Sequence, residues 1–192
     1  MDLTHLAYND EKSAVLKDVE NVADTGRCVN PLRQARIGQG IDVHPLVPGR
    51  DLVLGGVTIP HRLGLEGDTD GDVLTHAIMD ALLGALALGD LGQYFRRGQP
   101  EVDGARSITL LQRVCEMTKE QRYVVGNVDA TVVAEMPKLA PYRQQIQEIL
   151  AHAMDIAPSQ VSIKATTTDH LGMLGREEGI MAQAVVLLWP VS

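Results

Sequence analysis

Residues 69–88 read TDGDVLTHAIMDALLGALAL, and the pattern in this stretch guides the interpretation of the whole chain. Its apolar residues recur at the spacing of one broad helix face, which predicts a helix over Gly71–Leu88. Thr69 or Asp70 can cap the N-terminus of that helix, because a short polar side chain there accepts a hydrogen bond from a free backbone N–H. We therefore expect an amphipathic helix whose apolar face packs inward.

The polar side of this helix carries Asp72, His76 and Asp80 at positions i, i+4 and i+8, in one stacked column. A carboxylate one turn beyond a histidine can orient the imidazole as a metal ligand. A solvated polar helix face would produce the same column. The acidic residues near the cap are equally ambiguous, since they favour the helix dipole without any function or else order a loop that carries a site.

Upstream of the helix, Ala35–His44 predicts a strand that ends in Asp42-Val43-His44. Because Asp42 and His44 are two residues apart, their side chains leave the same face of the strand. With His76 they supply one carboxylate and two imidazoles, the ligand types that zinc takes when it keeps a fourth position open. An isolated Asp-x-His pair also arises at turns and surfaces, so the zinc hypothesis depends on His76.

Two later loops contain groups suited to phosphate. Ala134–Ala140 is stiffened by prolines and contains Lys138, which can meet a phosphate, although a plain strand-to-helix connection is the simpler alternative. Thr166–Asp169 ends a strand with hydroxyls and a carboxylate, which suit phosphate oxygens and a hard cation such as Mg²⁺. Threonine is also simply a good strand residue. Arg176, in the glycine-punctuated loop 172–179, is a candidate anion clamp.

The rest of the chain alternates between strands and helices. Strands are predicted at Leu52–Leu54, Val57–Ile59, Asn127–Ala134, Val161–Thr168 and Ile180–Trp189, and helices at Ile108–Gln121, with Ser107 as its cap, and at Pro141–Ile156. This order indicates an α+β fold in which a mixed sheet is covered on one face by helices. Residues 1–34 lack the pattern, so we expect a flexible N-terminal extension followed by a single domain over residues 35–192.

The composition of the chain argues against several classes of protein. The 192 residues are 45% apolar, which suffices for one well-buried domain. The formal net charge of −8 and the lack of a basic run argue against a nucleic-acid partner. No apolar run reaches membrane-spanning length and no signal-peptide pattern is present, so we expect no membrane association and a cytoplasmic location. Cys28 and Cys115 form no paired motif, which is typical of a reducing compartment.

Several segments together carry a family resemblance. They are Arg36–His44, Asp70–His76, Asp80–Ala85, Gly89–Gly92, Gly126–Asp129, Pro137-Lys138, Lys164–Thr168 and Gly175-Arg176. In this order and spacing they resemble the 2-C-methyl-D-erythritol 2,4-cyclodiphosphate synthase family, over about four-fifths of the chain from Arg36 to Leu188.

The resemblance implies an enzyme of non-mevalonate isoprenoid biosynthesis, a phosphorus–oxygen lyase. Its substrate would be 4-diphosphocytidyl-2-C-methyl-D-erythritol 2-phosphate, whose 2-phosphate attacks the β-phosphorus, closes a cyclic diphosphate and expels CMP. In such an intramolecular displacement, positioning and charge neutralisation do most of the catalysis. The resemblance also implies a homotrimer, in which the sheets of three subunits form the core and each active site lies between neighbouring subunits.

The resemblance also implies roles for individual residues, according to their positions within the matching motifs. Asp42, His44 and His76 would ligate zinc, with a substrate phosphate oxygen in the fourth position. Asp169 stands where the family has a glutamate near Mg²⁺ or Mn²⁺, and Thr167 matches the threonine that steadies the transferring phosphoryl group. The substrate-binding positions also include Asp42, His44, Asp68, Thr69, Asp90, Gly92, Phe95, Ala134, Pro137, Lys138, Ala140, Thr166, Thr167, Asp169, Met173 and Arg176.

Three departures from the family pattern matter, one of which is Gln39 in place of a histidine next to the metal strand. Asp68-Thr69 replaces a His-Ser pair whose histidine is held to stabilise the phosphoryl transition state, so we place Asp68 at a catalytic position. Arg96-Arg97 replaces a Pro-Asp pair after Phe95. An ionised Asp68 about 4 Å from a phosphate charge would be repelled by roughly 4 kcal/mol at an effective dielectric of 20. Arg96 or Arg97 can pair with Asp68 or supply the positive charge that the histidine gave.

The sequence therefore leaves two functions open. The first is an active synthase that depends on zinc and on Mg²⁺ or Mn²⁺. The alternative is a catalytically impaired homologue that binds zinc and a cytidine nucleotide or isoprenoid phosphate in a regulatory role.

Overall fold

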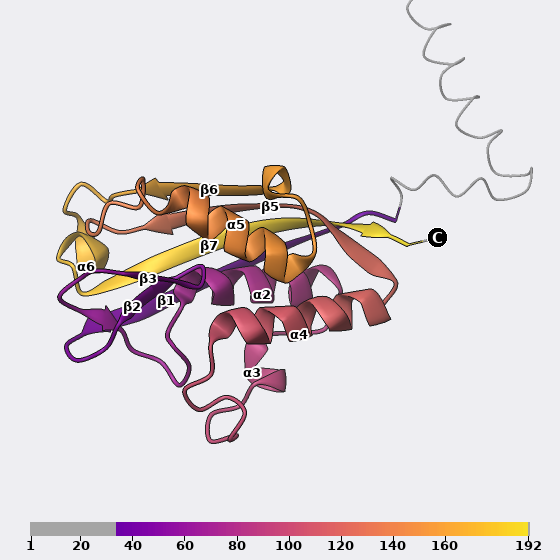
Figure 1. The fold of residues 1–192 in the computed structure, drawn as a ribbon, viewed down its shortest axis with the longest axis horizontal. Helices are drawn as coiled ribbons and strands as arrows, with labels where there is room; N and C mark the ends of the chain where they lie inside the picture. The colour runs from indigo at the N-terminus through magenta and orange to yellow at the C-terminus, as the bar shows by residue number, and fades with distance from the viewer. Residues whose placement is uncertain (1–33, 192) are drawn as a thin grey trace, which may run out of the picture. The chain divides into compact units, whose positions relative to one another are not determined.

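The computed structural model describes residues 34–191, so the predicted extension, apart from Gln34, lies outside the described residues. A five-stranded sheet has the order β4-β1-β7-β5-β6 (Figure 1). Its strands are β1 (Arg36–Val47), β4 (Gly64–Leu65), β5 (Tyr123–Val133), β6 (Val161–Thr166) and β7 (Gly179–Pro190). Neighbours are antiparallel except β5 and β6, which run parallel. The predicted mixed sheet is therefore confirmed.

Three helices, α2 (Val73–Ala85), α4 (Ser107–Glu120) and α5 (Arg143–Met154), cover one face of this sheet (Figure 1). Helix α2 packs on β1 and β7, α5 packs on β6, and α4 lies against α2 and α5. The hairpin β2 (Leu52–Leu54) and β3 (Val57–Ile59) forms a separate two-stranded sheet, as the sequence predicts. Short helices α3 (Leu91–Tyr94), α6 (Gly172–Gly175) and η3 (Pro158–Gln160) and strand β4 are additions that no sequence pattern predicted.

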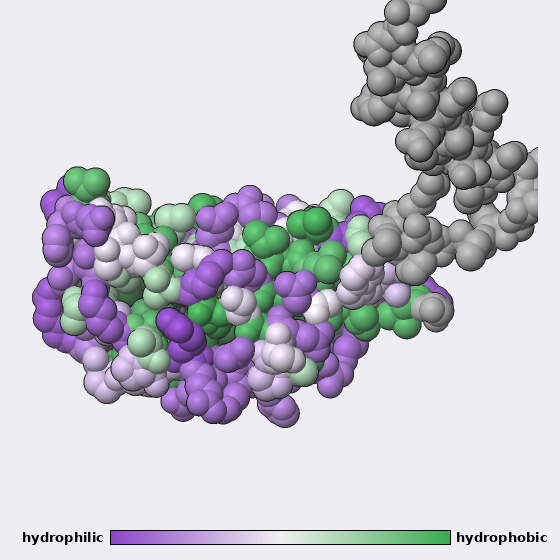
Figure 2. All heavy atoms as spheres, turned by 90° about the horizontal axis from the view of Figure 1, so that it is seen from above, coloured by the Kyte–Doolittle hydropathy of each residue, from purple (hydrophilic) through white to green (hydrophobic). Residues whose placement is uncertain are grey.

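The two faces of the sheet differ in what covers them. Along β1, Gly38 and Gly40 are buried beneath the helices, whereas Ile37 and Ile41 on the opposite face are 73% and 54% exposed. The same alternation runs along β7, where Ala184 is buried and Val185 is 39% exposed. Figure 2, which views the molecule from above, shows apolar surface in the middle of that side, with hydrophilic side chains gathered at the left end. The uncovered face of the sheet thus presents apolar side chains to the surface.

Helix α2 lies unusually close to β1. A Cβ atom on Gly38 would overlap the carbonyl oxygen of Ala81, and one on Gly40 would overlap that of Ala77. Glycine in the strand and alanine in the helix therefore allow backbone-to-backbone contact, which any larger side chain would push apart. This contact brings the polar side of α2 over the end of β1.

The N-terminus of α2 corrects two sequence-based interpretations. The helix begins at Val73, and its cap is Asp72 rather than Thr69 or Asp70. Asp72 is also fully buried and does not belong to a solvated column. Its carboxylate accepts hydrogen bonds from the N–H and hydroxyl of Thr75, at 3.1 and 2.6 Å, and from the N–H groups of Gly55 and Gly56, at 2.9 and 2.7 Å. Asp72 therefore fastens the β2–β3 hairpin to α2.

The predicted cap of the next helix is also wrong. Ser107 is the first residue of α4 itself, and the N-cap position is Arg106, which makes no side-chain capping bond. The hydroxyl of Ser107 donates instead to Asp70 at 2.5 Å, and the second Asp70 oxygen accepts from the Ser107 N–H at 3.1 Å. A distant carboxylate therefore caps α4, because the side chain of Arg106 at the N-cap position has no acceptor to offer.

None of the helices in the described part of the chain is both long and apolar enough to cross a membrane.

We predict that Gly40→Ala destabilises the protein by about 1–3 kcal/mol, because the new methyl group must displace the backbone of α2. Urea unfolding at a fixed protein concentration measures the change. Gly84→Ala is the matched control: Gly84 is exposed on α2, and its Cβ would come no nearer than 3.9 Å to another residue. This control should be neutral or stabilising by roughly 0.5–1 kcal/mol. Equal stability of Gly40→Ala and wild type would contradict the close contact.

Candidate metal centre and the surrounding pocket

Three ligand atoms converge where α2 crosses the end of β1. Asp42 Oδ2 lies 2.9 Å from His44 Nε2 and 3.1 Å from His76 Nδ1, and the two imidazole nitrogens are 3.3 Å apart. Strand alternation brings Asp42 and His44 to the helix-covered face, and the close packing of α2 brings His76 to meet them. Within residues 34–191, this is where His, Cys, Asp and Glu side chains gather in a geometry that can hold a metal.

The spacing of these atoms fits zinc. In a tetrahedral site with bonds of about 2.0–2.2 Å, neighbouring ligand atoms stand about 3.3–3.6 Å apart, a few tenths of an ångström more than the 2.9–3.3 Å observed here. The remaining ring nitrogens are also engaged: His44 Nδ1 donates to the carbonyl of Glu66, and His76 Nε2 lies 2.9 Å from the hydroxyl of Ser107. Both imidazoles can therefore direct a lone pair at the same point, as metal ligands require.

The Asp42 carboxylate and the His44 imidazole each favour the charged form of the other. Burial opposes ionisation of Asp42, but hydrogen bonds with His44 and His76 outweigh burial and hold the pKa of its carboxyl well below the usual range. For His44, burial favours the neutral ring, yet its hydrogen bonds with Asp42 and the Glu66 carbonyl raise its pKa. The carboxylate is consequently ionised at neutral pH, ready to bind a cation.

Asp80 does not have the role that its spacing suggested. It accepts a hydrogen bond from the N–H of Leu91 at 2.9 Å and so anchors the start of α3. The groups that contact the distal nitrogen of His76 are the hydroxyls of Ser107 and Thr69, at 2.9 and 3.1 Å. Ser107 lies 31 residues from His76, so no local spacing pattern could have identified it.

A cavity of about 650 Å³ opens beside the three ligands, within the usual size of a small-molecule site. Of the predicted substrate-binding residues, Asp42, His44, Asp68, Thr69 and Phe95 line it. Arg50 holds the loop that carries Asp68 by donating to the carbonyls of Gly67 and Thr69, at 2.7 and 2.5 Å. The structure thus brings these five residues together with the candidate metal centre.

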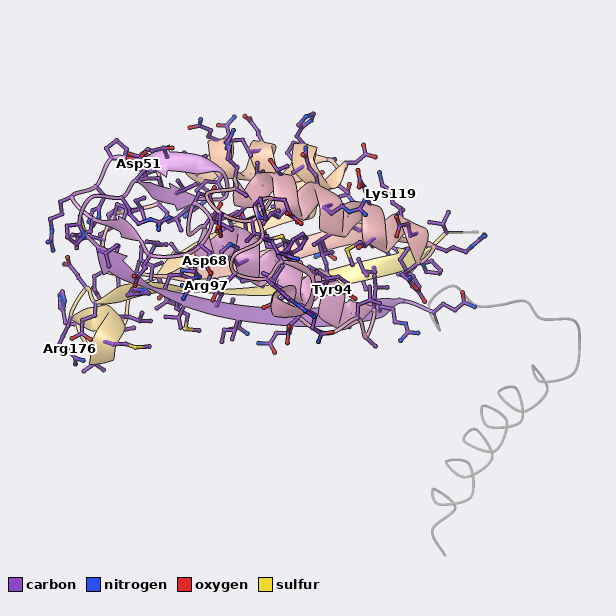
Figure 3. All side chains as sticks on the ribbon, turned by 90° about the horizontal axis from the view of Figure 1, so that it is seen from below. Asp51, Asp68, Tyr94, Arg97, Lys119 and Arg176 are labelled. Atoms are coloured by element: carbon purple, nitrogen blue, oxygen red, sulfur yellow. The ribbon has the colours of Figure 1, made fainter. Side chains whose placement is uncertain are left out.

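Arg97 also lines the cavity and pairs with Asp68. Its Nε donates to Asp68 Oδ1 at 2.7 Å, and Figure 3 shows the two side chains next to each other. The Arg97 side chain is 82% exposed and that of Asp68 is 36% exposed, so the pair stands at the mouth of the cavity. Between the two arginines that the sequence offered as partners, the structure selects Arg97.

A second group of predicted residues lies outside the cavity, at the carboxyl ends of β5 and β6. The N–H of Ala134 donates to the carbonyl of Thr166 at 3.0 Å, which joins the loop Ala134–Ala140 to the loop Thr166–Asp169. Glu135 is 7% exposed, and its Oε1 accepts from the N–H and hydroxyl of Thr168 and from the N–H of His170, at 3.0–3.1 Å. Sequence reasoning missed this buried glutamate, which fixes the shape of the threonine loop.

The remaining predicted residues occupy three places. Within the second group are Ala134, Pro137, Lys138, Ala140, Thr166, Thr167 and Asp169, and the Thr167 hydroxyl lies 3.3 Å from Asp169 Oδ1. Met173 and Arg176 belong to α6 and its C-terminal end, where Arg176 pairs with Glu178 at 2.7 Å and lies apart from Asp68 and Arg97 (Figure 3). Asp90 and Gly92 lie at the start of α3, outside the cavity lining.

Comparison with known proteins gives a consistent result. The YgbB family model matches residues 35–189. The curated 2-C-methyl-D-erythritol 2,4-cyclodiphosphate synthase of Moorella thermoacetica is 56% identical over 80% of this chain and 94% of that protein. The protein of the same name from Agathobacter rectalis is 54% identical over 80% of this chain and 86% of that protein.

Solved structures agree with these relatives. A CDP complex of IspF from Plasmodium falciparum is 33% identical, with a TM-score of 0.73 over 82% of this chain and 97% of that one. The bifunctional IspDF from Campylobacter jejuni is 37% identical, with a TM-score of 0.79 over 82% of this chain. The match spans 43% of that bifunctional chain.

We predict that the combined change Asp42→Ala, His44→Ala and His76→Ala abolishes zinc binding, because it removes all three convergent ligand atoms. Metal analysis of the purified protein after dialysis against buffered zinc measures the bound ion. His152→Ala, an exposed histidine on α5, is the matched control and should retain stoichiometric zinc. Zinc that persists in the triple variant would place the ligands elsewhere.

Proposed function

This chain belongs to the YgbB family, and we propose that it catalyses the reaction for which its curated relatives are named. The 2-phosphate of 4-diphosphocytidyl-2-C-methyl-D-erythritol 2-phosphate attacks the β-phosphorus. A new P–O bond closes the eight-membered cyclic diphosphate, and the bond from the β-phosphorus to the bridging oxygen breaks. CMP leaves with that oxygen. The protein is then a phosphorus–oxygen lyase of the non-mevalonate isoprenoid pathway, acting in the cytoplasm.

The observation that carries this proposal is the convergence of Asp42, His44 and His76 at the wall of a cavity large enough for a nucleotide-sized ligand. A zinc ion bound there would supply Lewis acidity and a fixed template for a phosphate group. The chain itself contributes placement, since β1 and α2 hold the three side chains in register before any ligand arrives. Placement of this kind lowers the barrier of an intramolecular displacement.

The second group completes the proposed site. Thr167 would hold the transferring phosphoryl group, and Asp169 would bind Mg²⁺ or Mn²⁺ beside the diphosphate, with oxygen ligands that suit hard cations. Lys138 and the backbone of Ala134–Ala140 would receive the cytidine end, since their loop is rigidly joined to the threonine loop by the Ala134–Thr166 bond and by Glu135. The zinc centre would thereby bind a phosphate of the substrate, and the second group would bind its diphosphate and cytidine end.

A homotrimer would bring these two groups together. Within one chain they lie on opposite sides of β7, because β1 carries the zinc ligands and β5 and β6 carry the second group. The uncovered face of β1 carries Ile37, Ile41 and Val43, which are 73%, 54% and 47% exposed. Burying this face among three sheets would remove apolar surface from water and place the second group of one subunit beside the cavity of its neighbour.

The domain organisation forms part of the proposal. We assign the synthase fold to residues 35–192 as a single domain and treat residues 1–34 as an extension, in line with the family match over residues 35–189.

The Asp68–Arg97 ion pair accounts for how a carboxylate is tolerated at a catalytic position. Its 2.7 Å geometry neutralises the charge of Asp68 at the mouth of the cavity. The guanidinium has further N–H donors, which can bind a phosphate oxygen while Nε remains on Asp68. Arg97 would therefore restore the positive charge that a histidine supplies in the family pattern.

The decisive experiment is CMP release. The purified full-length chain with Zn²⁺ and Mg²⁺ should convert the substrate to the cyclic diphosphate, with one CMP released per ring closed, measured by ³¹P NMR and nucleotide chromatography. The triple zinc-ligand variant should release none above background. CDP binding without CMP release by the wild-type protein would reject the synthase and favour the regulatory alternative.

We also predict that Arg97→Ala lowers kcat/KM by about ten- to a hundredfold, because Asp68 would then face the substrate phosphates unpaired. The effect should stay below the roughly three decades expected for an unscreened 4 kcal/mol repulsion, since both side chains contact water. The double variant Asp68→Ala with Arg97→Ala should recover part of this loss.

Arg96→Ala is the matched control, since the neighbouring arginine does not line the cavity, and it should keep wild-type kinetics. Unchanged kcat/KM in Arg97→Ala would contradict the compensating role of the pair.

A further inference from the structure

The outer side of His76 is enclosed by a small hydrogen-bond network. Its Nε2 lies 2.9 Å from the hydroxyl of Ser107 and 3.1 Å from that of Thr69, and Ser107 is 2.5 Å from Asp70 Oδ1. Ser107 is fully buried and Thr69 is 7% exposed, so water does not mediate these contacts. The network joins the loop before α2, the first residue of α4 and the candidate zinc ligand.

The available donors and acceptors determine the direction of each hydrogen bond in this network. The Asp70 carboxylate only accepts, and its two oxygens already receive the N–H groups of Ser107 and Asp72, at 3.1 and 3.4 Å. At 2.5 Å from Oδ1, the single hydroxyl hydrogen of Ser107 is committed to Asp70 in a charge-assisted bond. The hydroxyl oxygen can then only accept from His76.

Thr69 reinforces this arrangement. The Thr69 hydroxyl lies 3.2 Å from Ser107 Oγ, and because the Ser107 hydrogen is committed to Asp70, the Thr69 hydrogen can donate to Ser107 Oγ. The Thr69 oxygen then accepts from the N–H of Gly71 at 3.2 Å and offers a second acceptor to His76 Nε2. A hydrogen on Nε2 is therefore favoured by two oxygens. On the other side of the ring, Nδ1 lies 3.1 Å from Asp42 Oδ2 and 3.3 Å from His44 Nε2, which can accept a hydrogen from Nδ1 in the metal-free protein. Because a neutral imidazole carries one hydrogen, metal binding at Nδ1 requires that hydrogen on Nε2, where the two hydroxyl oxygens receive it.

We propose that Asp70 and Ser107, assisted by Thr69, are positioning residues that hold His76 in the Nε2–H tautomer and so aim its Nδ1 lone pair at the metal. The carboxylate acts through Ser107 without touching the imidazole. This inference rests on the zinc-binding part of the proposed function and not on turnover. It also explains why the Asp70 side chain is not used to cap α2.

A purely structural role for Asp70 is the competing explanation, because the same carboxylate caps α4 through the Ser107 N–H. The two explanations differ in the tautomer, which a helix cap does not control. Asp42→Ala with His44→Ala removes both acceptors beside Nδ1, so the tautomer of His76 in this double variant reports on the Ser107 and Thr69 side of the ring. Long-range ¹H–¹⁵N spectra of the zinc-free double variant measure the tautomer, and a further His76→Gln change identifies the His76 signals. We expect the Nε2–H form; the Nδ1–H form would overturn the proposal.

Asp70→Asn tests the network with almost no change in shape. Its amide must either face the Ser107 N–H, donor against donor, or donate to the Ser107 hydroxyl, whose hydrogen can then turn toward His76 Nε2. In the background of the double variant we expect Asp70→Asn to raise the population of the Nδ1–H tautomer. In the otherwise wild-type protein we expect it to lower the zinc affinity, measured by chelator competition, about 10- to 100-fold. Ser107→Ala, which leaves Thr69 as the remaining acceptor, should weaken zinc binding in the same direction.

Asp51→Asn and Ser159→Ala, both at exposed positions, are the matched controls and should keep wild-type zinc affinity. Circular dichroism checks that each variant is folded, and the tautomer in the double variant decides the question even if Asp70→Asn or Ser107→Ala does not fold. An unchanged tautomer together with wild-type zinc affinity in both Asp70→Asn and Ser107→Ala would overturn the proposal. CMP release is not a readout here, so a failure of this inference is distinguishable from a failure of the proposed reaction.

Discussion

The contact between β1 and α2 is the constraint on which the rest of the structure depends. Gly38 and Gly40 allow the carbonyl groups of Ala81 and Ala77 to lie directly on the strand. The two elements meet at backbone distance, which leaves no room for a side chain between them. His76 consequently reaches Asp42 and His44, which follow the glycines on the same face of β1. Packing and metal-site geometry are thus two results of one contact.

Three acidic residues join, through hydrogen bonds, segments that are distant in the sequence. Asp72 joins α2 to the β2–β3 turn, Asp70 joins the preceding loop to α4, and Glu135 joins the loops after β5 and β6. Asp72 and Glu135 are buried and Asp70 is half-buried, and each carboxylate satisfies several hydrogen-bond donors. Asp70, Asp72 and the three candidate metal ligands therefore form a hydrogen-bonded framework beside a cavity that faces solvent at Asp68 and Arg97, whereas Glu135 holds the second group outside that cavity.

The arrangement of the sheet separates the two groups of candidate site residues within one chain. Strand β7 lies between β1 and β5, so Asp42 and His44 of the candidate metal centre and the threonine loop are held on different strands of the same sheet. The exposed apolar side chains of β1 and β7 lie on the face that no helix covers. A fold that leaves this face open is suited to assembly, and assembly is what the proposed reaction would require of it.

The sequence by itself determined the fold class, the hairpin at Leu52–Ile59, the main helices to within a few residues and the three zinc-ligand candidates. These depend on short-range periodicity: strand alternation places Asp42 with His44, and helical spacing buries the apolar face of α2. Only the tertiary structure decided which acid caps α2, which arginine pairs with Asp68, and that Ser107 rather than Asp80 contacts His76. Those choices depend on which donors and acceptors the packed backbone leaves unpaired, and partners 29 to 37 residues apart leave no periodic trace in the chain.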